Sequence, residues 1–217
     1  MSKSFYRTIG KRMLDLVCSV VALIILCPAL LLVGLLVRIN LGSPVIFRQS
    51  RPGRHAKLFT LFKFRSMNNA KDANGRSLPD DLRLTKFGRF LRASSCDELP
   101  ELFNVIRGDM SLVGPRPLLA EYLDRYTPAQ ARRHEVRPGM TGWAQVNGRQ
   151  DIPFSVRFIY DVEYVKSYTF FLDVRILFMT VFRLYGAGVR SGQNVLEVDD
   201  IGLSDLKGTF HPGGRHD

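Results

Sequence analysis

The chain has 217 residues, enough for one sizeable core, and nothing in its composition requires a second domain. Lysine and arginine total 31 against 20 aspartate and glutamate residues, and the net charge of +11 predicts an anionic partner: nucleic acid, acidic lipid or a phosphorylated substrate. Three cysteines do not form a disulfide framework, and the four histidines lack the spacing of a zinc site.

The first forty residues predict a membrane-associated element. Basic and apolar residues alternate up to Leu14, which is typical of a helix lying at a membrane surface. The apolar run Leu16–Val37 follows and is long enough for about 30 Å of helix, the thickness of a bilayer core. This run is too long for the apolar part of a signal peptide.

Two membrane topologies are open for this run. Pro28 lies near its middle and removes a helical hydrogen bond, and basic residues flank both ends, whereas a spanning helix should show a one-sided excess. These features favour a helix-break-helix hairpin that enters and leaves by the cytoplasmic face. A kinked spanning helix is the alternative, because transmembrane prolines are tolerated. We expect Asp15 to pair with Lys11 or Arg12, one helical turn away.

A small β-hairpin is predicted after this element. Val45–Phe47 and Leu58–Phe64 are strand-like, and the basic, turn-forming residues 51–54 separate them. Lys63 interrupts the aromatic second strand, where a lysine is costly unless an anion meets it. The alternative is an edge-strand lysine that extends to water. Residues 66–81 are polar and predict a mobile loop.

Two helices are predicted around a pair of adjacent acids. Leu82–Ala93 has apolar residues at helical spacing, and Arg92 lies at its end. The second helix carries an apolar stripe from Leu99 to Ile106 and ends near Gly108.

The acid pair Asp97-Glu98 between these helices is the main chemical signal. Adjacent acids flanked by arginines suit phosphate chemistry, because one carboxylate can attack or hold a metal while the cations hold an anionic substrate. The same residues also spell a capping box, with Ser95 as N-cap and Glu98 at the third helical position. The two interpretations are compatible, since a helix N-terminus is itself an anion site.

Arginines recur in the second half of the chain. Arg116 stands between two prolines, whose restricted backbone would hold the guanidinium in place for bidentate phosphate binding; a structural turn is the alternative. Arg149 ends the glycine-rich stretch 137–149 and can reach a phosphate. An amphipathic helix is predicted over Glu121–Arg133, with an interruption near Pro128, and a second apolar, interfacial helix over Tyr168–Tyr185.

Taken together, the motifs resemble those of the bacterial sugar transferase family, the small monotopic phosphoglycosyl transferases that initiate glycan assembly. The resemblance covers roughly residues 7–185 and rests on five motifs in order. They are Lys11-Arg12-x-x-Asp15, Lys63–Met67, Asp97-Glu98-Leu99, Gly108–Pro117 and Arg137–Arg149.

The resemblance implies a reaction and a nucleophile. Asp97 would attack the β-phosphate of a UDP-sugar, expel UMP and hold the phospho-sugar until polyprenyl (undecaprenyl) phosphate takes it, in a ping-pong cycle. Glu98 would orient groups or handle a proton. Mg²⁺ would neutralise the diphosphate and contact Asp97.

The resemblance also implies the remaining site residues and the hairpin break. Lys63, Arg92, Arg116 and Arg149 match positions that the family places around substrate or lipid phosphates. Cys27 stands where we expect serine before the breaking proline, and a thiol is a weaker partner for freed backbone groups, so the break would depend more on Pro28.

The expected fold class is α+β and mostly helical. Residues 1–40 would form the re-entrant membrane hairpin, residues 41–190 a cytosolic catalytic domain with the β-hairpin and amphipathic interfacial helices, and residues 191–217 a polar tail. The resemblance places the protein at the cytoplasmic face of the bacterial inner membrane, at the first membrane step of glycoconjugate or polysaccharide biosynthesis. Downstream glycosyltransferases are expected partners and nucleic acid is not.

Two rival hypotheses compete with this one. A non-catalytic, membrane-tethered basic module that binds acidic lipid or nucleic acid explains the net charge, but it does not explain an acid pair among arginines. The other places the nucleophile at Cys96, because a position at a helix start near Arg92 favours a reactive thiolate.

Overall fold

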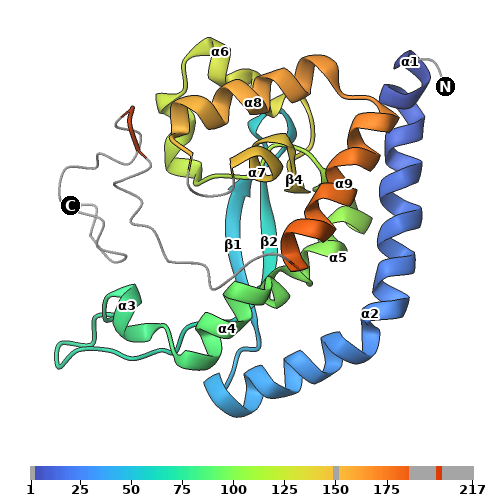
Figure 1. Cartoon of the computed structure of the whole chain (residues 1–217). Helices are drawn as coiled ribbons and strands as arrows, with labels where there is room; N and C mark the ends of the chain where they lie inside the picture. The colour runs from blue at the N-terminus through green and yellow to red at the C-terminus, as the bar shows by residue number, and fades with distance from the viewer. Residues whose placement is uncertain (1–2, 149–151, 186–198, 202–217) are drawn as a thin grey trace.

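The computed structural model describes residues 3–148, 152–185 and 199–201. An antiparallel hairpin of β1 (Ile46–Pro52) and β2 (Leu58–Phe64) runs through the middle of the molecule, and helices surround it (Figure 1). A second, short pair joins β3 (Ser111–Val113) and β4 (Gly139–Thr141) in parallel. The expected mostly helical α+β class and the predicted hairpin are confirmed, with a first strand that is longer than expected.

The helices account for most of the described chain. Their bounds are α1 Lys3–Phe5, a π-helical turn Tyr6–Gly10, α2 Lys11–Leu41, α3 Asp80–Arg83, α4 Lys86–Ser94, α5 Glu101–Arg107, α6 Pro128–Ala131, α7 Trp143–Gly148, α8 Phe154–Ser167 and α9 Phe170–Tyr185. Short 3₁₀ segments cover Arg54–Ala56, Cys96–Glu98, Ala120–Arg125 and Arg132–Glu135.

The long apolar element is one bent helix in place of the two helices that we expected. α2 continues through Pro28 without interruption, and Figure 1 shows it turning sharply so that its final part runs beneath the rest of the molecule. A proline removes one hydrogen bond and bends the helix axis, while the residues on either side keep their own helical bonds. The helix then ends at Gly42, whose φ of 80° suits glycine.

Both ends of α2 are attached to the rest of the protein. Near its start, Lys11 lies 2.6 Å from the buried carboxylate of Asp173 on α9. Near its end, Val37 and Leu41 pack with Phe64 of β2 and Leu91 of α4. Between these attachments most of its apolar side chains face outward, and the helix is long and apolar enough to cross a membrane.

Asp15 has partners other than those we expected. Its carboxylate accepts hydrogen bonds at 3.0 Å from the hydroxyl of Ser111 and from the backbone N–H of Leu112, both on β3. Arg12 instead donates to the carbonyls of Val105 and Ile106 at the end of α5, at 2.6 and 2.8 Å. The basic start of α2 therefore closes the C-terminus of α5, where a cation is electrostatically favoured.

The main core joins the hairpin to the helices. Its buried members are Leu61, Leu102, Val105, Met110, Leu112, Val113, Val146, Tyr164 and Ile176. Asn104 of α5 fixes the register against β2, because its amide donates to the carbonyl of Thr60 at 2.7 Å and accepts from the N–H of Phe62 at 3.0 Å. This contact sets the start of α5 beside the last residues of β2.

The interruption predicted near Pro128 is confirmed, because Pro128 opens a new helix with Thr127 as its cap in a capping box with Gln130; the part before it is a 3₁₀ helix. The helix expected over 82–93 needs correction, because it is two helices, α3 and α4, and Thr85 caps the second. We did not predict α8, although Phe154, Phe158 and Val165 recur at helical spacing on its buried face. The expected tail lies outside the described residues, apart from 199–201.

Candidate active site

The acid pair lies in a tight turn between two helices. α4 ends at Ser94, Ser95 adopts a left-handed conformation with φ 57°, and the 3₁₀ turn Cys96–Glu98 leads into α5. The capping box that we considered is not formed, because Ser95 makes no side-chain cap. Its N–H closes α4 by donating to the carbonyl of Arg92 at 3.2 Å, and α5 starts only after Pro100.

Asp97 is a buried carboxylate, with 7% of its surface exposed. Burial raises its pKa to about 6, the neighbouring Glu98 carboxylate adds to this rise, and Lys63, Arg116 and Arg92 partly oppose it. Within the described parts of the chain no salt bridge uses Asp97. A weakly solvated carboxylate that is not paired with a cation is well suited to act as a nucleophile.

Glu98 is bound by two cations. Lys63 of β2 lies 3.0 Å from its Oε1, and both terminal nitrogens of Arg116 contact its two oxygens. Burial would raise the pKa of Glu98, but Arg116 and Lys63 outweigh that effect and hold its pKa at about 2. Glu98 is therefore ionised at any physiological pH and fixes Lys63 and Arg116 in place.

A third acid completes this cluster. Glu101, in the first turn of α5, is 1% exposed and lies 3.1 Å from the Nζ atom of Lys63. Burial and the Glu98 carboxylate raise its pKa to about 7, against the opposing effect of Lys63 and Arg116. Glu101 is not among the predicted site residues, although its three-residue spacing from Glu98 at a helix start could have indicated it.

The acid pair is approached by Lys63 from β2 and by Arg92 from α4. Arg92, at the end of α4, donates to the hydroxyl of Ser66 at 2.9 Å and lowers the pKa of Asp97. The neighbouring Arg65 is structural, since it donates to the carbonyls of Ser43 and Met67 at 2.7 and 3.0 Å.

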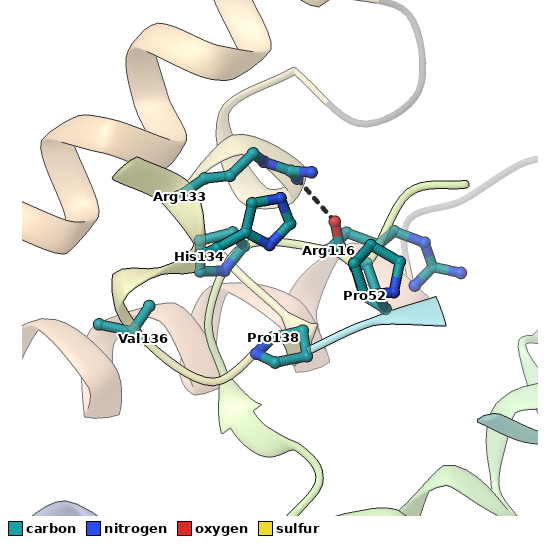
Figure 2. Close-up of a pocket in the computed structure, with 8 residues that line it drawn as sticks. Pro52, Arg116, Arg133, His134, Val136 and Pro138 are labelled. Atoms are coloured by element: carbon teal, nitrogen blue, oxygen red, sulfur yellow. Dashed lines mark hydrogen bonds between the residues drawn. The ribbon is translucent and has the colours of Figure 1, made fainter. Parts of the chain in front are cut away.

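Arg116 is held at both ends. Its carbonyl accepts from Arg133 at 2.7 Å, as Figure 2 shows, while its guanidinium contacts Glu98. Arg133 is fully buried and forms a 2.8 Å ion pair with Asp161 of α8. This pair was not predicted from the sequence, and through Arg133 it holds the backbone of the Pro-Arg-Pro corner in place.

Two hollows of the described part of the protein are not lined by Asp97. A cavity of about 10 Å³, room for roughly one water molecule, lies between Pro52, His134 and Pro138, and the Arg116 guanidinium extends away from it (Figure 2). An open groove of about 440 Å³ lies at the turn end of the hairpin and is lined by residues such as His55 and Tyr126. Asp97 lines neither of them.

The structure brings five of the six predicted charged site residues together. Asp97, Glu98, Lys63, Arg92 and Arg116 form one cluster, whereas Arg149 lies outside the described residues. Cys96, the rival nucleophile, is half-buried and packs against the apolar cluster of Val37, Leu41, Phe64 and Leu91.

Of the acids in this cluster, Asp97 is the one that could serve as a ligand of a magnesium ion. Within residues 3–148, 152–185 and 199–201, no three side chains of the metal-binding types gather at one point. Mg²⁺ commonly binds one or two carboxylates together with phosphate oxygens and water. Asp97 is available for such a contact, because the ion pairs of the site are made by Glu98 and Glu101.

Comparison with known proteins gives a consistent result. The model of the family described as bacterial sugar transferase matches residues 6–187. The chain is 49% identical over 197 residues to the uncharacterized sugar transferase EpsL of Bacillus subtilis, covering 90% of this chain and 98% of that protein.

Longer relatives carry more specific names. The chain is 41% identical to the UDP-glucose:undecaprenyl-phosphate glucose-1-phosphate transferase of Xanthomonas campestris, covering 83% of this chain and 40% of that protein. It is 43% identical to the undecaprenyl-phosphate galactose phosphotransferase of Salmonella typhimurium, covering 78% and 39%. The chain therefore spans only about two fifths of these longer relatives. On the family match and the similarity to these relatives, this chain belongs to the bacterial sugar transferase family.

Proposed function

We propose that this protein transfers a phospho-sugar from a UDP-sugar to polyprenyl phosphate and releases UMP. The observation that carries the proposal is Asp97, a buried carboxylate free of salt bridges with described residues, beside cations that Glu98 holds in place. The names of the longer relatives, which include undecaprenyl-phosphate sugar phosphotransferases, support the same reaction class.

The proposed mechanism has two displacements at phosphorus. An oxygen of Asp97 attacks the β-phosphorus of the UDP-sugar, a new O–P bond forms, and the bond to the UMP oxygen breaks. The phospho-sugar is then an acyl phosphate on Asp97. A phosphate oxygen of the polyprenyl phosphate attacks the same phosphorus, and the Asp97 carboxylate leaves, which gives the polyprenyl-diphosphate-sugar and regenerates the enzyme.

The cations and Glu98 have distinct roles in this proposal. Lys63 and Arg116 stabilise the charge that develops on the transferred phosphate, and Arg92 contacts the same group from α4. Glu98 orients Lys63 and Arg116 and does not act as a base, since its pKa of about 2 makes it a very weak proton acceptor. Arg149 remains a predicted phosphate ligand. Mg²⁺, held by Asp97 and the donor diphosphate, would neutralise phosphate charge.

We also propose that α2 is a re-entrant element in the cytoplasmic leaflet. Both of its ends contact the same protein body, through Lys11 at the start and Leu41 at the end. A straight helix of 31 residues would span about 46 Å and place its ends on opposite sides of a bilayer. Large exposed apolar side chains occur near the middle of the helix, where Ile24, Ile25 and Leu31 are 70%, 69% and 72% exposed.

α9 supplies a second apolar surface. Phe171 and Phe178 are 80% and 64% exposed, while Asp173 faces inward and is completely buried. This arrangement suits a helix lying in the membrane interface with its apolar face in lipid. The product would be carried by a lipid, so a membrane-bound glycosyltransferase is the class of enzyme that would consume it.

The mass of the intact protein tests the proposal directly. Detergent-solubilised wild-type protein, mixed with a panel of UDP-sugars and Mg²⁺ but no polyprenyl phosphate, should gain the mass of one phospho-sugar with its own donor. Asp97→Asn should gain none, and Cys96→Ser should gain the same mass as wild type. UMP release only after polyprenyl phosphate is added, with no adduct for any donor, would contradict the covalent mechanism and leave Asp97 as a metal ligand.

A further inference from the structure

Arg51 lies on the same face of the β-hairpin as Lys63. The register pairs Phe47 with Lys63 and Arg51 with Phe59, and directly opposed residues of an antiparallel pair project to one face. Four strand positions separate the two pairs, a distance of about 13 Å at about 3.3 Å per residue. Both cations therefore project from the same face of the hairpin as Leu61, whose side chain is part of the main core.

The guanidinium of Arg51 is incompletely satisfied. One terminal nitrogen donates to the amide oxygen of Gln49 at 2.8 Å. Its Nε atom is buried and has no hydrogen-bond partner among the described residues, and no carboxylate of that part of the chain forms a salt bridge with it. A buried charged donor without an acceptor is unfavourable, and an arriving anion would remove that cost.

Arg116 is the cation that most affects Arg51. The pKa of Arg51 is lowered, first by burial and then by the charge of Arg116, with Glu121 and Glu101 opposing. Pro52, next to Arg51, lines the same small cavity as Arg116. Lys63 contacts Glu98, Glu98 contacts Arg116, and the charge of Arg116 acts on Arg51. A guanidinium group can bind a phosphate by two hydrogen bonds, so Arg116 and Arg51 both offer suitable partners for this anion.

We propose that Arg51 binds a phosphate group of the substrate beside Arg116 and extends the row of cations that begins at Lys63. This assignment rests on the proposed function, because it takes a phosphorylated substrate as given. The shared chemistry is a phosphate, which either the nucleotide donor or the lipid acceptor can supply. Several cations in one region suit a substrate that carries more than one phosphate.

Calorimetric titration of the full-length, detergent-solubilised protein tests the proposal with two probes. UDP represents the donor, and inorganic phosphate represents the acceptor headgroup. The test variant is Arg51→Gln, and the matched control is Arg48→Gln. Arg48 is exposed on the opposite face of the same strand, 6.0 Å over the Phe62 ring, and its substitution removes the same charge.

Arg51→Gln should weaken binding of UDP roughly tenfold or more, the loss expected for one charged hydrogen-bonding partner, while Arg48→Gln stays within about twofold. Weaker binding of inorganic phosphate alone would also support the proposal and assign Arg51 to the acceptor. Arg51→Lys keeps the positive charge but lacks the planar guanidinium, so its binding affinity should lie between those of wild type and Arg51→Gln. This variant replaces Arg51→Gln in the experiment if Arg51→Gln does not fold.

Two results would contradict the proposal, and they are distinguishable. Variants of Arg51 that bind both probes as tightly as wild type would remove the role of Arg51 and leave the proposed function intact. Wild-type protein that binds neither UDP nor phosphate would contradict the proposed function and, with it, the role of Arg51.

Discussion

Lys63 on β2 lies 3.1 Å from the Oε1 atom of Glu101 on α5, and the same ammonium group lies 3.0 Å from Glu98. One cation thus lies between two carboxylates, one with a pKa of about 2 and the other with a pKa of about 7. Their pKa values differ because Arg116 and Lys63 outweigh the effect of burial at Glu98, whereas burial and the Glu98 charge together raise the pKa of Glu101. This relationship separates an acid that is always ionised from one that titrates near neutrality.

The first prediction concerns Glu98 as an orienting residue. Glu98→Gln removes the charge that holds Arg116 and Lys63, so formation of the Asp97 adduct should slow by roughly 10- to 100-fold, equivalent to about 1.5–3 kcal/mol. The defect should be the same size from pH 8 to pH 9, because an acid with a pKa of about 2 does not titrate there and Asp97 and Glu101, with pKa values of about 6 and 7, are already ionised. The rate of adduct formation is measured by mass spectrometry of the intact protein under single-turnover conditions. A defect that disappears at high pH would instead assign Glu98 the role of a base.

The second prediction concerns the pH dependence of stability through Glu101. Its pKa in the folded state, about 7, lies above its ordinary value of 4.5. The stability that its protonated form contributes is complete below pH 4.5 and is lost as pH rises through 7. The melting temperature of wild type should therefore fall between pH 5 and pH 8 more steeply than that of Glu101→Gln. Parallel curves for the two proteins would show that Glu101 does not titrate in this range.

The third prediction concerns the buried ion pair behind Arg116. Asp161→Asn leaves the Arg133 charge buried without its counter-ion and should destabilise the protein by about 3–5 kcal/mol. The double variant Arg133→Met/Asp161→Leu should regain most of that stability, as measured by thermal unfolding. It should still form the adduct slowly, because the carbonyl of Arg116 has lost its donor. Full activity in the stable double variant would show that Arg133 does not position Arg116.

The fourth prediction tests the topology of α2. In a protein whose three cysteines are replaced by serine, single cysteines are introduced at the exposed positions Ser4, Ser43 and Asn74. A membrane-impermeant maleimide should label all three in inside-out bacterial membrane vesicles and none in intact spheroplasts. Asn74 lies in the loop after β2 and reports the side of the catalytic body. Labelling of Ser4 from the side opposite to Ser43 and Asn74 would show a spanning helix.

The local elements could be predicted from sequence because each depends on neighbouring residues. The hairpin follows from alternating apolar strands around a turn, and α5 ends at Gly108, where φ is 93°. The Pro-Arg-Pro corner and the acid pair at a helix junction are likewise features of a few adjacent residues. The sequence by itself determined these elements, the predicted charged residues and the family resemblance.

The tertiary structure decided which charges meet and which are buried. Asp173 is paired with Lys11, and Asp161 with Arg133, across elements that are far apart in sequence, so no local pattern specifies these pairs. Pro28 bends α2 without ending it, because neighbouring turns retain their own hydrogen bonds. The different ionisation of Glu98 and Glu101 also depends on burial and on the position of Arg116, and both quantities exist only once the chain has folded.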